Sequence, residues 1–164
     1  MKTTDLSPEF IMLVGLPASG KSTYIKQLLA DNPDKHYVVI STDDILSALG
    51  DAEGLSYSQA FDKFSGQADK KMKIQFRQAK NTNSNIVIDR TNLTLNGRRK
   101  FLSQLPKEYL TKAVVFDVSR DELDRRLLRR EIETGKYVPK HVVDSMQRNY
   151  VPPSKSEFNE IVYV

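Results

Sequence analysis

The sequence predicts an α/β protein in which a parallel five-stranded sheet carries helices on both faces. Short apolar runs typical of buried strands alternate along the chain with longer, more polar segments of helical spacing. The strand-like runs occur at 10–14, 37–41, 85–89, 113–118 and 160–164. A parallel arrangement is expected because strands that alternate with helices are joined by crossover connections.

The size and composition of the chain limit the classes of protein to consider. Its 164 residues are enough for one domain, which we place at 10–164 after a polar tail at 1–9. The absence of cysteine excludes disulfides and thiolate metal sites, and no apolar run approaches the length of a membrane span. We therefore expect a soluble, cytoplasmic protein with no membrane partner. The net charge of +4 is compatible with a polyanionic partner.

The first strand-like run is followed by a nucleotide-binding pattern. Residues 15–23 read GLPASGKST, which fits G-x-x-x-x-G-K-[ST], and we call them the phosphate loop. Its backbone N–H groups would surround phosphates, Lys21 would reach the β- and γ-phosphates, and Ser22 would supply a ligand for Mg²⁺. A turn that only caps the next helix is the alternative, which the preceding strand disfavours. The predicted cofactor-binding residues of the loop are Gly15, Ala18, Ser19, Gly20, Lys21, Ser22 and Thr23.

Two aspartates follow the second strand-like run, at the end of a strand where open α/β sheets bind ligands. Asp43 and Asp44 come directly after Thr42. A carboxylate at this position could accept the proton of an acceptor hydroxyl during phosphoryl transfer. The alternative is that one of the three residues caps the helix that follows. We expect one aspartate to serve as the base and the other to cap.

The third strand-like run also ends in an acid. Asp89 could hold Mg²⁺ directly or through water, and it is followed by Arg90, Thr91 and Asn92. The alternative is an aspartate that only orders the loop at 90–96.

Two helices with many basic residues are predicted farther along the chain. The segment 58–80 has an aromatic stripe, which we interpret as core packing, and lysines that we interpret as a solvated face. A second helix opens with Ser119 to Glu122, which fits a capping box, and carries Arg125, Arg126, Arg129 and Arg130. These arginines could close over a triphosphate, with Gly135 as the hinge of a lid, or they could simply pair with neighbouring acids.

Five segments in this order resemble the kinase domain of phage polynucleotide 5′-hydroxyl kinase and its P-loop kinase relatives. The segments are GLPASGKST, STDD, VIDRTNLTLNGRRKF, FDVSRDELDRRLLRR and YVPKHVVDSM, and the resemblance covers about 10–164. It implies a three-layer P-loop kinase fold with strand order 2-3-1-4-5 and ATP with Mg²⁺ as cofactors. It also implies that Asp43 activates the acceptor hydroxyl and that Arg126 and Arg130 are the catalytic arginines of the lid, beside Lys21.

The chain departs from this family at several positions. Leu46 stands where the phage enzyme has an arginine for the acceptor nucleotide, and Arg90 stands where it has an acid. Arg90, Thr91 and Asn92 are the predicted acceptor-side residues, since Arg90 could replace the missing contact. The sequence lacks an Asp-x-Asp-Gly-Thr motif, so we expect no 3′-phosphatase activity.

The favoured function is therefore ATP-dependent transfer of a phosphoryl group to the 5′-OH end of DNA or RNA. A kinase for a nucleoside, nucleotide or sugar nucleotide is the alternative, supported by Leu46 and the modest net charge. A nucleotide-dependent switch without transfer activity is disfavoured, because a switch needs no base at Asp43. The expected cationic surface for nucleic acid comprises Arg90, Arg98, Arg99 and Lys100, with Lys70 and Lys73 of the long helix as further candidates.

Overall fold

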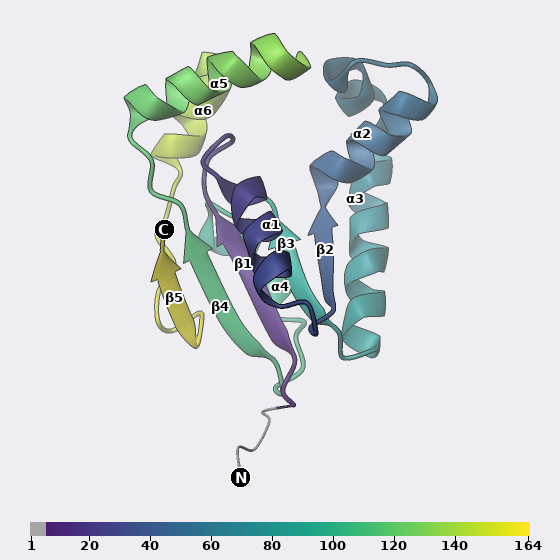
Figure 1. The fold of residues 1–164 in the computed structure, drawn as a ribbon, viewed down its shortest axis with the longest axis vertical. Helices are drawn as coiled ribbons and strands as arrows, with labels where there is room; N and C mark the ends of the chain where they lie inside the picture. The colour runs from purple at the N-terminus through teal and green to yellow at the C-terminus, as the bar shows by residue number, and fades with distance from the viewer. Residues whose placement is uncertain (1–5) are drawn as a thin grey trace.

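The computed structural model describes residues 6–164 and shows a five-stranded parallel sheet (Figure 1). The strand order is β2-β3-β1-β4-β5, which confirms the predicted topology. The strands are β1 (Glu9–Val14), β2 (Tyr37–Ser41), β3 (Asn85–Asp89), β4 (Leu110–Val115) and β5 (Glu160–Tyr163). Every neighbouring pair runs parallel, so all carboxyl ends of the strands meet at one edge of the sheet.

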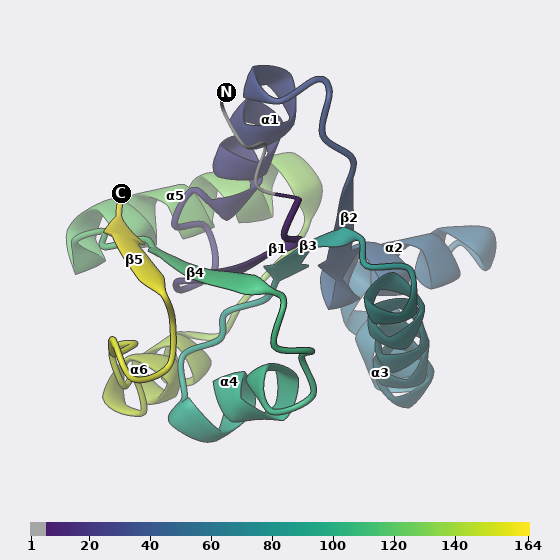
Figure 2. The same cartoon turned by 90° about the horizontal axis from the view of Figure 1, so that it is seen from below.

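Helices cover both faces of the sheet, so the fold has three layers. Seen along the strands, α1 lies on one face, and α3, α4 and α6 lie on the other (Figure 2). Helix α5 crosses the edge of the sheet at which the strands end (Figure 1). The helices are α1 (Lys21–Asp31), α2 (Thr42–Ala52), α3 (Tyr57–Asn81), α4 (Leu95–Leu102), α5 (Arg120–Thr134) and α6 (Lys140–Arg148). No helix within 6–164 is long and apolar enough to cross a membrane.

Strand β1 is buried on both faces, which explains its continuous apolar sequence. Phe10, Met12 and Val14 belong to one core cluster, whereas Ile11 and Leu13 belong to the cluster on the opposite face. Successive side chains of a strand point to opposite faces, and here each face is covered by helices. The same double burial makes the central strands recognisable from the sequence.

The observed boundaries correct several predictions. Glu9, assigned to the tail, is the first residue of β1, and its N–H donates to Asn85 Oδ1 at 2.9 Å; residues 1–5 of that tail lie outside the described residues. Strand β4 begins at Leu110 and ends at Val115, earlier than the expected 113–118, because its polar first half pairs with β1 from Glu9 onward. The predicted capping box of α5 is only half formed, since the Glu122 side chain binds arginines instead of the backbone.

Arg98 is buried, so its assignment to a cationic surface was wrong. Its side chain is 0% exposed and forms an ion pair with Glu157, with 2.8 Å between Nε and Oε1. Its Nη1 also donates to the carbonyl oxygens of Asn92 and Val151, at 3.1 and 2.8 Å. Arg98 thus joins α4, the loop after β3 and the segment before β5 in one hydrogen-bonded network.

Replacing Glu157 tests how much this buried ion pair stabilises the fold. Glu157→Gln leaves the Arg98 charge buried without its partner, so we expect the free energy of unfolding to fall by about 3 kcal/mol. The exposed pair of Asp69 and Lys73 provides the control, because Asp69→Asn should change stability by no more than about 0.5 kcal/mol. Urea denaturation followed by circular dichroism measures both values.

The stability difference between Glu157→Gln and the unchanged protein should also depend on pH. Burial alone would raise the pKa of Glu157, but hydrogen bonds from Arg98 and Ser154 lower it below its ordinary value of 4.5. The ion pair therefore stabilises the protein above that value, and this contribution is lost as the pH falls through the lower pKa of the folded state. A stability difference between Glu157→Gln and the unchanged protein that stays constant from pH 7 to pH 3 would contradict this assignment.

Candidate active site

A cleft of about 1000 Å³ lies where the strands of the sheet end. The phosphate loop, the first turn of α2, the end of β3 and one side of α5 form its walls. Most of the predicted site residues therefore meet in one place, although they come from distant parts of the sequence. Among the predicted residues that line the cleft are Ala18, Ser19, Gly20, Lys21, Ser22, Thr23, Asp43, Asp44, Asp89, Arg90, Thr91, Arg126 and Arg130.

The phosphate loop has a shape that requires glycine. Gly20 has φ +110° and precedes α1, whereas a Cβ on Gly15 would lie 2.5 Å from Ser19 Oγ. Ala18 also has a positive φ, of 64°, which is uncommon for a residue other than glycine. Ser19 Oγ is buried and has no hydrogen-bond partner among the described residues. A tight loop with an unpaired polar atom at the start of a helix fits a phosphate ligand.

Lys21 is held at the centre of the loop. Its ammonium group donates to the carbonyl oxygens of Gly15 and Leu16, both at 2.8 Å. Burial lowers the pKa of Lys21 from 10.5 to about 8, while Asp89 and Asp43 act in the opposite direction. The negative charge of a bound phosphate would favour the charged form of this lysine.

Three aspartates line the cleft near the ends of β2 and β3, and two of them, Asp43 and Asp89, affect the pKa of Lys21. Asp43 and Asp44 lie in the first turn of α2, and neither caps it: the Ser41 hydroxyl accepts a hydrogen bond from the Asp44 N–H at 3.2 Å. The prediction that one of the two is the cap was therefore wrong, and Asp43 instead accepts a hydrogen bond from Tyr57. Burial raises the pKa of Asp89; Lys21 lowers it, and Asp44 and Asp43 raise it.

The donor set suits a magnesium ion that is bound together with a nucleotide. Within 6–164 there is no group of three His, Cys, Asp or Glu residues that could hold a metal ion alone. Mg²⁺ in phosphate sites takes few protein ligands and completes its shell with phosphate oxygens and water. Ser22 and Asp89, which both line the cleft, could supply the oxygen ligands.

Helix α5 places two arginines over the phosphate loop. Arg126 Nη1 lies 3.9 Å from the position that a Cβ on Gly20 would take, and its Nε forms an ion pair with Glu122 at 3.0 Å. Arg130 lies near enough to affect the pKa values of Lys21 and Asp89. Gly135, with φ +72°, ends the helix as predicted. The arrangement can neutralise charge that develops on a transferring phosphoryl group.

The loop after β3 connects the phosphate loop to a second cavity. Asn92, with φ +49°, is buried, and its amide nitrogen donates to the Leu13 carbonyl at 2.7 Å. The Gly15 N–H donates to the Thr91 carbonyl at 3.0 Å. The Asn92 side chain thus ties the loop after β3 to β1, and the Thr91 carbonyl ties the same loop to the phosphate loop.

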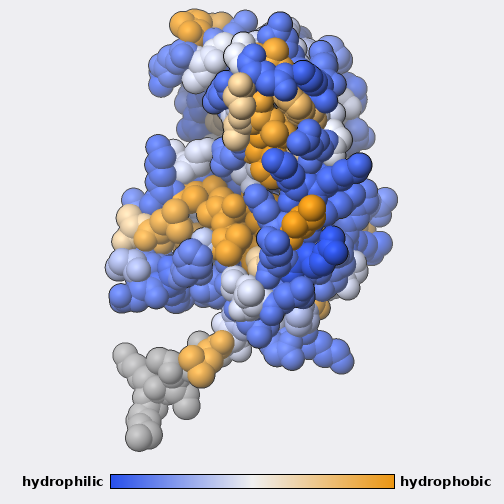
Figure 3. Space-filling model, turned by 90° about the vertical axis from the view of Figure 1, so that its right-hand side faces the viewer, coloured by the Kyte–Doolittle hydropathy of each residue, from blue (hydrophilic) through white to orange (hydrophobic). Residues whose placement is uncertain are grey.

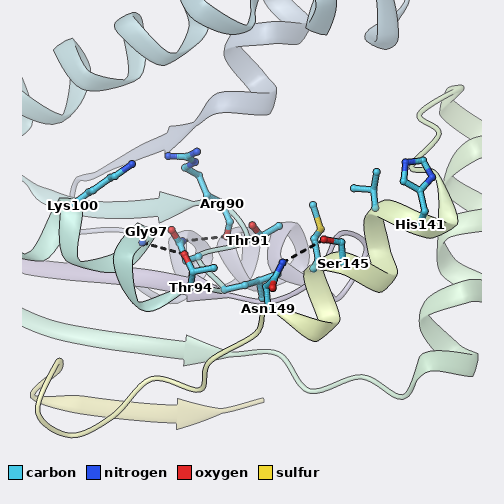
Figure 4. Close-up of a pocket in the computed structure, with 12 residues that line it drawn as sticks. Arg90, Thr91, Thr94, Gly97, Lys100, His141, Ser145 and Asn149 are labelled. Carbon is cyan, nitrogen blue, oxygen red and sulfur yellow. Dashed lines mark hydrogen bonds between the residues drawn. The ribbon is translucent and has the colours of Figure 1, made fainter.

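The second cavity, of about 450 Å³, lies between this loop, α4 and α6. Arg90 and Thr91 line both cavities. In the close-up, the Arg90 and Lys100 side chains extend to the same side, while His141 lies across on α6 (Figure 4). The guanidinium carbon of Arg90 is 5.9 Å from the ring centroid of Phe101. Sequence reasoning did not identify His141, because a single histidine on a polar helix gives no signal.

Comparisons with known proteins identify one family and several similar proteins. The family model AAA_33, described as an AAA domain, matches residues 10–153. Heterogeneous nuclear ribonucleoprotein U-like protein 2 of mouse and of human is 30% identical over 160 residues, which are 94% of this chain and 21% of that protein. L-seryl-tRNA(Sec) kinase of Methanococcus maripaludis is 25% identical over 145 residues, which are 87% of this chain and 52% of that protein.

Among solved structures, a fungal RNA kinase has the same fold. It superposes with a TM-score of 0.52 and 15% sequence identity, over 96% of this chain and 74% of that chain. The chain spans about a fifth of the length of the two ribonucleoprotein relatives and about half of the length of the L-seryl-tRNA(Sec) kinase.

The lowered pKa of Lys21 leads to a testable pH dependence of ATP binding. With a pKa of about 8, the charged fraction of Lys21 falls by about eightfold between pH 7.5 and pH 9. Because phosphate favours the charged lysine, the dissociation constant for ATP should rise by about the same factor. Titration calorimetry at the two pH values measures it. Lys21→Met, which lacks the titrating group, should bind weakly and show no such change; an equally flat profile for the unchanged protein would contradict the assignment.

Proposed function

The chain belongs to the AAA domain family, and we propose that it is a kinase that transfers the γ-phosphoryl group of ATP to the 5′-OH end of a nucleic acid. The observation that carries the proposal is the meeting of Lys21, Asp43 and Arg130 in one cleft. A cation for the phosphates, a carboxylate for the acceptor and a basic lid are the parts that phosphoryl transfer to an alcohol requires.

The donor side of the cleft would bind the triphosphate. The N–H groups of the phosphate loop and the Lys21 ammonium would contact the β- and γ-phosphates. Bound Mg²⁺, held through Ser22 and Asp89, would neutralise phosphate charge as the bond to the leaving ADP breaks. Arg126 and Arg130 would stabilise the charge on the transferring group from the opposite side, where α5 covers the loop.

Asp43 would accept the proton of the acceptor hydroxyl. As the acceptor oxygen forms its bond to the γ-phosphorus, the bond from that phosphorus to the β–γ bridging oxygen breaks, and ADP leaves with the electron pair. The hydroxyl proton passes to the Asp43 carboxylate. The side chain is exposed in the wall of the cleft, so an incoming hydroxyl can reach it.

The second cavity favours a polyanionic acceptor. It is lined by the exposed cations Arg90 and Lys100 and opens beside the cleft through residues common to both. A nucleic acid whose 5′ end reaches Asp43 could pass its backbone phosphates along these cations. The names of two similar proteins, a kinase of seryl-tRNA(Sec) and an RNA kinase, support an acceptor carried by RNA.

A small acceptor is the second candidate, and Leu46 is the observation that favours it. This side chain is 1% exposed and packs in the core, so the position gives no cation to the cleft. A nucleoside or sugar nucleotide, which has fewer phosphates to contact, would not need one. The salt dependence described below separates the two acceptors.

Asp43→Asn tests the proposed base. The amide keeps the size of the carboxylate but cannot accept the proton, so turnover should fall by a factor of roughly a hundred to ten thousand while ATP affinity is retained. Phosphoryl transfer from labelled ATP and calorimetric ATP binding measure the two properties. Asp44→Asn is the matched control, and loss of transfer in that variant alone would make Asp44 the base.

Salt dependence tests the polynucleotide acceptor. Apparent affinity for an oligonucleotide should fall steeply with salt, with a slope of about 0.7 per contacted phosphate on a double-logarithmic plot. Arg90→Gln with Lys100→Gln should reduce the slope and weaken oligonucleotide binding, and Lys100→Gln alone, which does not change the lining of the cleft, should do so without affecting ATP. Arg99, which we expected to belong to the same cationic surface, is exposed on α4 but does not line the cavity, so Arg99→Gln is the control. A KM for the oligonucleotide that responds to neither salt nor these changes would favour the small acceptor.

A further inference from the structure

A chain of contacts leads from Asp43 to the connection after α5. Tyr57, the first residue of α3, donates its hydroxyl to Asp43 Oδ1 at 2.8 Å. The ammonium group of Lys136 lies 5.4 Å from the centroid of the Tyr57 ring, within the range of a cation–π contact. Lys136 directly follows Gly135, the C-cap residue of α5. Figure 1 shows the carboxyl end of α5 reaching across toward the α2–α3 connection.

The tyrosine is well placed to hold the carboxylate in one orientation. Its contact with Oδ1 leaves Oδ2 of Asp43 available for an acceptor hydroxyl. Burial and the negative charge of Asp43 raise the pKa of Tyr57, so its hydroxyl remains a donor at neutral pH. The backbone of Tyr57 is fixed by a capping box between Ser56 and Gln59.

Helices α2 and α3 are also packed closely against each other. A Cβ on Gly50 of α2 would lie 2.7 Å from Cβ of Ala60 in α3, so only glycine allows this approach. The distance between the backbones that carry Asp43 and Tyr57 is therefore set by the packing of the two helices. In contrast, Lys136 belongs to the connection after α5, the helix that carries Arg126 and Arg130.

We propose that Tyr57 is a positioning residue for Asp43 and that its contact with Lys136 couples the base to the position of the lid. The proposal rests on the proposed role of Asp43 as the base. With Lys136 on the ring, Tyr57 joins the wall of the cleft that α2 forms to the connection after the helix that carries Arg126 and Arg130. Closure of the lid over the phosphates and orientation of the base then become one event.

Two single variants separate the two contacts of Tyr57. Tyr57→Phe removes the hydroxyl but keeps the ring, so kcat should fall by about tenfold or more, while KM and the dissociation constant for ATP change less than about twofold. Lys136→Met keeps the length of the side chain but loses the charge, so ATP should bind about two- to fivefold more weakly. The exposed neighbours provide the controls: Tyr137→Phe and Lys140→Met should leave all of these values unchanged.

A double-variant cycle tests the coupling itself. In a Tyr57→Leu background, which lacks the ring, Lys136→Met should weaken ATP binding no further. The ATP affinities are measured with a fluorescent ATP analogue and need no acceptor. An equal effect of Lys136→Met with and without the ring would overturn the coupling.

The outcomes also separate this inference from the proposed function. If Asp43→Asn abolishes transfer but Tyr57→Phe keeps its kcat within about twofold of the unchanged protein, the positioning role is wrong and the proposed function stands. If the unchanged protein transfers phosphate to no acceptor, the proposed function fails and the positioning role fails with it. The coupling between Lys136 and Tyr57 is still decided by the ATP-affinity cycle in that case.

Discussion

The buried guanidinium of Arg98 is the constraint on which the geometry of the cleft depends. It fixes the Asn92 carbonyl and the segment before β5, while the Asn92 side chain binds the end of β1. Gly15, at the start of the phosphate loop, is tied to Thr91 of the same loop after β3. The phosphate loop and the loop after β3, which would contact the donor and the acceptor in the proposed reaction, are therefore held to one another by hydrogen bonds that are largely shielded from water. The relative position of the two loops matters because displacements of about 1 Å can greatly slow a reaction.

Electrostatic balance is the second property of the cleft. Burial lowers the pKa of Lys21, and the nearby aspartates and Arg130 oppose one another in their effects on it. Asp89 is likewise affected by charges of both signs. A nucleotide with its magnesium ion would change this balance by adding phosphate charge beside Lys21 and a cation beside Asp89. The site thus combines hydrogen-bonded loops with charges that would respond to the ligand.

The parts of this structure that could be predicted are those determined by residues close together in the sequence. The central strands could be predicted because burial on both faces makes residues 10–14 uniformly apolar, and the phosphate loop because its backbone demands glycine at Gly20. Arg98 could not be recognised as buried, since its partner Glu157 is 59 residues away and an arginine in a short helix ordinarily faces water. For the same reason the contact of Tyr57 with Asp43, across two helices, has no local signature.

The most direct test of the proposed phosphoryl transfer is incubation of the protein with γ-labelled ATP, Mg²⁺ and a panel of acceptors. The panel contains DNA and RNA oligonucleotides with 5′-OH ends, the same oligonucleotides with 5′-phosphate ends, nucleosides and sugar nucleotides. The account predicts label at the 5′ end of the 5′-OH oligonucleotides and none on their 5′-phosphorylated forms. Label on no member of the panel, from protein that binds ATP, would contradict it.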